Sequence, residues 1–127
     1  MKYEYVLKKV KEIIPVLLKK FQDSPKVYIG KTENPKECAI RHEQDDKLFY
    51  LTILAVGDPS AISKLETEVI KGLKESRNIE IVNRTEISSG NQNADKLYVC
   101  FDGYLPKDDF GEYNLELSEE FPLTINE

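Results

Sequence analysis

A single carboxylate interrupts the apolar side of one predicted helix. Between residues 59 and 76 the apolar side chains recur at roughly 100° per residue, which predicts an amphipathic helix. Its buried stripe contains Ile62, Leu65, Val69, Ile70 and Leu73. Glu66 falls inside this stripe, where a carboxylate is costly unless it is paired, protonated or bound to a cation. Two interpretations follow for Glu66: a stripe-edge residue that reaches water or pairs with a base, or a metal ligand or functional acid.

A second group of chemically able side chains lies on a short predicted helix. Cys38 and His42 are one helical turn apart on one face, and Arg41 lies beside them. A lone histidine is usually a surface or satisfied core residue, but the nearness of Tyr28 and Arg41 makes His42 a candidate for proton transfer or phosphate contact. Cys38 and Cys100 lack metal-ligand spacing, and we interpret both as buried, reduced thiols.

Local patterns predict the elements that must position these residues. Asn34 and Glu37 have the spacing of a capping box around Pro35, so a helix is predicted to begin there. Pro15 predicts a kink or a break in the first helix. The predicted helices cover 3–21, 35–43 and 59–76, the predicted strands cover 26–30, 48–56 and 97–101 with a brief extended segment near 79–81, and turns or loops fill 22–25, 44–47 and 88–93.

This order of elements predicts one compact domain of the α/β (α+β) class. We expect a small, mainly antiparallel central sheet flanked by helices, because the chain of 127 residues is long enough for one core and too short for two. Within it we distinguish an N-terminal helical segment at 1–25, a core at 26–103 and an acidic, irregular C-terminal extension at 104–127.

The charge of the chain is unevenly distributed. The net charge is -5, but residues 107–127 contain seven acids and one base, which leaves 17 bases and 16 acids in residues 1–106. The near-neutral body lacks a strong electrostatic footprint for DNA. No apolar run approaches the roughly 20 residues needed to cross a bilayer, so we expect no membrane partner and a cytoplasmic location.

Part of the sequence resembles the GIY-YIG nuclease family. Tyr28-Ile29-Gly30, then Asn34-Pro35 and a helix ending in Arg41-His42, is similar to the second half of that signature. The family continues with a strand, a helix bearing one metal-binding Glu and a loop with an Asn, which Glu66 and Asn83 match in order and spacing. The resemblance covers about half the chain, from Val27 to about Asn91.

The resemblance implies metal-assisted hydrolysis of a phosphodiester, with one divalent cation, usually Mg²⁺. Glu66 would hold the metal, Tyr28 would lie at the attacking water, His42 would orient a tyrosine or move a proton, and Asn83 would brace the site. Lys31, Arg84 and Tyr98 are candidates for binding the substrate.

Two features depart from the family pattern. The first motif, a Gly-Ile-Tyr strand, is absent, and Cys38 stands where an arginine that grips the phosphate is expected. We expect Arg41 or Arg84 to substitute for that arginine. The missing edge strand is expected at 97–101, beside 27–30, with Tyr98 replacing the lost tyrosine.

These observations leave alternatives open for function. One is a divergent, metal-dependent endonuclease acting on DNA or RNA. Another is a catalytically silent binding module on the same scaffold, which recognises a nucleotide, a nucleic-acid end or a protein. The missing arginine, the missing tyrosine and the near-neutral body favour the silent module. A weaker idea is that the acidic residues 107–127 cover a basic groove.

Overall fold

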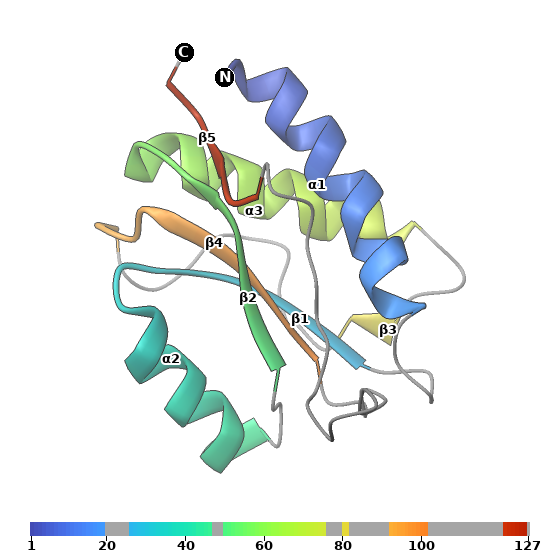
Figure 1. Cartoon of the computed structure of the whole chain (residues 1–127), viewed down its shortest axis with the longest axis vertical. Coiled ribbons are helices and arrows are strands. Elements are labelled where there is room, and N and C mark those ends of the chain that lie inside the picture. Colours follow the sequence, from blue (N-terminus) through green and yellow to red (C-terminus); the bar gives the residue numbers. More distant parts are fainter. Residues whose placement is uncertain (20–25, 47–49, 76–79, 82–91, 102–120, 127) are drawn as a thin grey trace, which may run out of the picture.

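A computed structural model describes residues 1–19, 26–46, 50–75, 80–81, 92–101 and 121–126 (Figure 1). Three α-helices, one π-helical turn and five strands are defined within these ranges. They are α1 (Tyr3–Leu18), β1 (Lys26–Thr32), α2 (Pro35–Arg41), η1 (His42–Asp46), β2 (Tyr50–Val56), α3 (Pro59–Lys74), β3 (Glu80–Ile81), β4 (Lys96–Phe101) and β5 (Leu123–Thr124). None of the helices in the described ranges has the length and apolar character that crossing a membrane requires.

The strands form one mixed sheet in the order β3-β1-β4-β2-β5. The two central pairings, β1 with β4 and β4 with β2, are antiparallel, whereas β3 and β5 run parallel to their neighbours at the two edges. The predicted α+β class with a mainly antiparallel centre is therefore confirmed, and the parallel edges are an addition that the sequence did not predict.

One face of the sheet carries the main hydrophobic core, with α3 and α1 packed on it. Strand residues alternate between faces, so Val27 and Ile29 of β1 and Leu97, Val99 and Phe101 of β4 all point to this side. The helices contribute apolar stripes: Val6, Val10, Ile14 and Leu17 from α1, and the predicted Ile62, Leu65, Val69, Ile70 and Leu73 from α3. Helix α1 thus belongs to the same core as the strands.

The opposite face of the sheet is covered by α2 and has a smaller cluster. Its buried members are Cys38, Tyr98 and Cys100, with Tyr28, Leu51 and Ile53 packed against them. Figure 1 shows α2 standing apart from α1 and α3, with the strands between them. The domain is therefore built in layers, and each side chain of β1 and β4 faces one layer or the other.

Side-chain caps begin two of the helices, and the one at Asn34 lies where it was predicted. The Oδ1 of Asn34 accepts a hydrogen bond from the Glu37 backbone N–H at 3.2 Å, and the Oδ1 of Asp58 accepts one from Ser60 N–H at 2.9 Å. Helix α1 continues through Pro15 without the break that was one of two predicted outcomes. Residues 42–46 continue α2 as a π-helical turn, so the turn predicted at 44–47 is wrong over its described part.

The end of the chain is not wholly irregular, contrary to prediction. Leu123 and Thr124 form β5 beside β2, and the Ile125 N–H donates to the Val56 carbonyl at 2.8 Å. The amino terminus of Met1 donates to the Thr124 carbonyl at 2.9 Å, which joins the two ends of the chain. Residues 102–120, most of the predicted acidic extension, lie outside the described residues.

Candidate functional site

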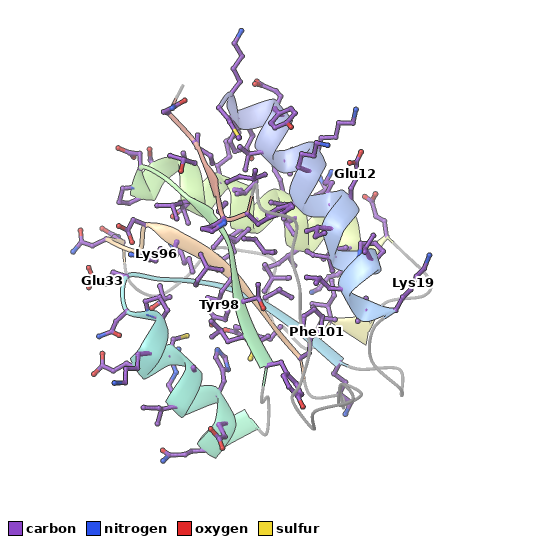
Figure 2. All side chains as sticks on the ribbon, in the orientation of Figure 1. Glu12, Lys19, Glu33, Lys96, Tyr98 and Phe101 are labelled. Carbon is purple, nitrogen blue, oxygen red and sulfur yellow. The ribbon has the colours of Figure 1, made fainter. Side chains whose placement is uncertain are left out.

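Two tyrosines lie on neighbouring strands of the face covered by α2. In the antiparallel pairing of β1 with β4, Tyr28 lies opposite Cys100 and Gly30 lies opposite Tyr98. The predicted adjacency of 97–101 to 27–30 is confirmed, but β4 is a central strand and not the edge strand we expected. Figure 2 shows Tyr98 along β4 and Phe101 at its end; Phe101 belongs to the core on the other face.

His42 completes an aromatic cluster with these two tyrosines. Its Nε2 lies 2.5 Å from the Oη of Tyr98, and both residues are buried, with 2% and 1% of their surface exposed. The ring centroids of His42 and Tyr28 are 4.6 Å apart, and those of the two tyrosines are 6.1 Å apart with planes inclined by 20°. Burial and the hydrogen bond and charge interaction with the neighbouring Cys38 raise the pKa of Tyr98 far above its ordinary value, so Tyr98 is a neutral phenol.

The same cluster contains Cys38, whose thiol can lose a proton to become an anion, and Arg41, whose guanidinium is a cation. The Nη2 of Arg41 lies 3.6 Å from the Sγ of Cys38, one turn earlier on α2. Burial raises the pKa of the Cys38 thiol, but hydrogen bonds from His42 and Tyr98 and the positive charges of His42 and Arg41 outweigh it, so that pKa is lowered. Arg41 itself is exposed at the rim, and beside Cys38 and the tyrosines its pKa is raised despite partial burial.

The cluster therefore combines three kinds of group. A buried imidazole and phenol share a short hydrogen bond that can pass a proton, a half-buried tyrosine ring borders them, and an exposed guanidinium stands at the edge. Such a guanidinium matches the geometry of a phosphate or carboxylate. Tyr28, Arg41, His42 and Tyr98, four of the predicted site residues, are thus brought together.

Glu66, the predicted metal ligand, lies elsewhere in the fold. It is on α3 and is buried, with 6% of its surface exposed, among the core residues Leu65 and Val69. Because α3 packs on the face opposite to Tyr28 and Tyr98, the sheet stands between the carboxylate and the aromatic cluster. The described residues do not fit the arrangement in which Glu66 holds a cation beside Tyr28 and His42. Within the described ranges, no group of three or more His, Cys, Asp and Glu side chains is placed to bind a metal ion.

Of the remaining predicted site residues, only Lys31 is described, and it does not join the cluster. Lys31 points to the α3 face, where its Nζ donates to the Oγ of Ser63 at 2.7 Å. Asn83 and Arg84 lie outside the described residues.

Cys38 was interpreted from the sequence as a buried, reduced thiol, and no role in the site was assigned to it. The signal for such a role is its four-residue spacing to His42, noted in the sequence, with Arg41 between them, which places a thiol, an imidazole and a guanidinium close together on one helix. Comparisons with protein-family models, curated proteins and solved structures gave no match. The GIY-YIG resemblance therefore stays a prediction.

Proposed function

We propose that this chain is a binding module on a divergent GIY-YIG-like scaffold, which recognises a phosphate of nucleic acid through the Arg41 side of the aromatic cluster. One observation carries the proposal: Arg41, Tyr28 and His42 share one face of the sheet, whereas Glu66 lies on the other. An exposed guanidinium can bind a phosphate through its N–H donors, and this binding does not require a carboxylate beside it.

The side chains around Arg41 support recognition of a nucleotide. Arg41 is exposed on α2, so its N–H groups can reach a phosphate oxygen without moving the buried His42 and Tyr98. Tyr28 is half-buried beside the imidazole, and a partly exposed tyrosine ring is a surface on which an unpaired base can stack. These features favour a single-stranded segment or an end over the regular side of a duplex.

Fluorescence anisotropy with labelled single-stranded and duplex oligonucleotides, in the presence of a chelator, tests the proposal. We expect the single strand to bind better, and Arg41→Gln to weaken it by about tenfold and to reduce the salt slope by about one counterion. Lys36→Gln removes an exposed positive charge from the same helix and is the matched control. Absence of binding, or equal loss in both variants, would refute this function.

A metal-dependent endonuclease is a second candidate, favoured by the short His42–Tyr98 contact. That contact is the kind of pair that moves a proton during hydrolysis. Incubation of the chain with DNA and RNA in Mg²⁺ or Mn²⁺ distinguishes the candidates. Metal-dependent cleavage that disappears in Tyr98→Phe would establish the nuclease and overturn the silent module, whereas binding without cleavage supports the module.

We further propose a cytoplasmic location. Cys38 and Cys100 are both free thiols, which suits a reducing compartment. Fractionation of cells that express the full chain would test this, and recovery of the protein outside the cytoplasm would contradict it.

A further inference from the structure

The sulfur of Cys38 lies among groups that favour its anionic form. Arg41 approaches the Sγ from the solvent side at 3.6 Å, and His42 follows Cys38 by one turn. Tyr98 belongs to the same buried cluster as Cys38 and bonds His42 at 2.5 Å. A cysteine that is surrounded by a guanidinium, an imidazole and a phenol is in an electropositive, hydrogen-bonding environment, which is where reactive thiols occur in proteins.

Cys100 provides an internal comparison for Cys38. Both thiols belong to the cluster between the sheet and α2, and neither forms a disulfide. Cys38 keeps 3% of its surface exposed on α2 next to the exposed Arg41, whereas Cys100 keeps none on the central strand β4. Access from solvent and the nearby positive charge therefore both favour Cys38.

We propose that Cys38 is a nucleophilic thiolate that reacts with small peroxides, with Arg41 and His42 as the groups that hold it in that state. Its substrates are oxidants as small as hydrogen peroxide, because a residue with only 3% of its surface exposed excludes bulky ones. This inference does not depend on nucleic-acid binding.

The reaction is an ordinary two-electron oxidation of sulfur. The Cys38 thiolate attacks one oxygen of hydrogen peroxide, an S–O bond forms as the O–O bond breaks, and hydroxide leaves and takes a proton from solvent to become water. Sulfur is oxidised to a sulfenic acid and the peroxide is reduced. Because Arg41 contacts the Sγ of Cys38, its guanidinium can donate a hydrogen bond to the oxygen that is added to the sulfur.

The test exposes the folded chain to hydrogen peroxide, removes the peroxide with catalase and then unfolds the chain in dimedone, so that this trap for sulfenic acid reaches both sulfurs. Peptide mass spectrometry then measures the adducts of Cys38 and Cys100 in the same sample. We expect oxidation of Cys38 to be at least about tenfold faster than that of Cys100, and its rate to level off at a pH below the ordinary thiol range of about 8.5. Equal rates at the two cysteines, or oxidation of Cys38 only when the peroxide is added in denaturant, would overturn the proposal.

Variants separate the role of charge from a structural role. Arg41→Gln should slow the labelling of Cys38 and move the midpoint of its pH profile upward, whereas Arg41→Lys should keep both close to the wild type because it retains the charge. Lys36→Gln, exposed on the same helix, should change neither. Circular dichroism confirms that each variant is folded. An unchanged pH profile in a folded Arg41→Gln protein would show that Arg41 does not hold the thiolate.

Discussion

Gly30 lies against the ring of Tyr98, and the ring can occupy this position only because Gly30 has no side chain. The two residues are opposite one another in the pairing of β1 with β4. A Cβ at Gly30 would meet the Oη, Cζ and Cε1 of Tyr98, the last at 2.7 Å, which is closer than such atoms approach. The ring therefore lies across β1, and its hydroxyl reaches His42.

Gly30→Ala is expected to displace the Tyr98 ring and to lengthen its hydrogen bond with His42. Tyr98 is buried and cannot swing into solvent, so the overpacking should lower the free energy of unfolding by about 1–3 kcal/mol. Urea denaturation followed by circular dichroism measures this change.

Gly72→Ala is the matched control for that substitution. A Cβ at Gly72 would lie 2.9 Å from the Cε of Lys11, the movable end of a long side chain, and Gly72 is helical, in the last turn of α3. Stability should therefore hold or rise by about 0.5–1 kcal/mol. If both alanines destabilised the chain equally, the steric account of Gly30 would be wrong.

Tyr98→Phe should remove the hydroxyl and leave the buried imidazole of His42 without that partner. The expected loss of stability is about 1–3 kcal/mol, because the buried Nε2 of His42 loses this hydrogen bond and cannot replace it with one to water. Tyr5→Phe, at an exposed position of α1, should have little effect. Thermal and urea unfolding of both variants provide the comparison, and equal stability of Tyr98→Phe and the wild type would argue against a structural role for the bond.

Glu66→Gln should leave oligonucleotide affinity in chelator within about twofold of the wild type, because the sheet separates residue 66 from Arg41 and distant sites act independently. Anisotropy titrations of Glu66→Gln and Arg41→Gln side by side measure this. A loss of affinity in Glu66→Gln as large as in Arg41→Gln would show that the carboxylate belongs to the same site.

Ionisation of Tyr3 should lower the free energy of unfolding at alkaline pH. Its Oη donates to the Oε2 of Glu68 at 2.5 Å, and burial together with that carboxylate raises the pKa of the phenol. A group whose pKa is raised on folding contributes stability below its unfolded value, about 10 for tyrosine, and loses that contribution as the pH rises further. Tyr3→Phe should therefore weaken the fall in unfolding free energy above this pH. Denaturation across an alkaline pH series checks the slope, and a slope left unchanged by Tyr3→Phe would contradict this account.

Leu123→Ala should destabilise the domain by about 2–5 kcal/mol, because Leu123 is fully buried in the main core although it comes from the last residues of the chain. Thr124→Ala, at the exposed neighbouring position of β5, should cost far less. Urea unfolding midpoints compare the two, and similar small effects would mean that β5 contributes little to the fold.

The sequence by itself determined where helices begin and which face of a helix is buried. Asn34 caps α2 where its spacing predicts, and the stripe of α3 is buried where periodicity places it. These features depend on hydrogen bonds and apolar spacing within a few residues, so local pattern is enough to predict them.

Only the tertiary structure decided which chemically able residues meet. Glu66 and Tyr28 were grouped from their order along the chain, but strand alternation sends Tyr28 to one face and α3 packs on the other. Tyr98 meets His42 because β4 inserts between β1 and β2, a pairing over a sequence separation of 56 residues. Long-range strand order depends on the packing of the whole core, and no local pattern of residues encodes it.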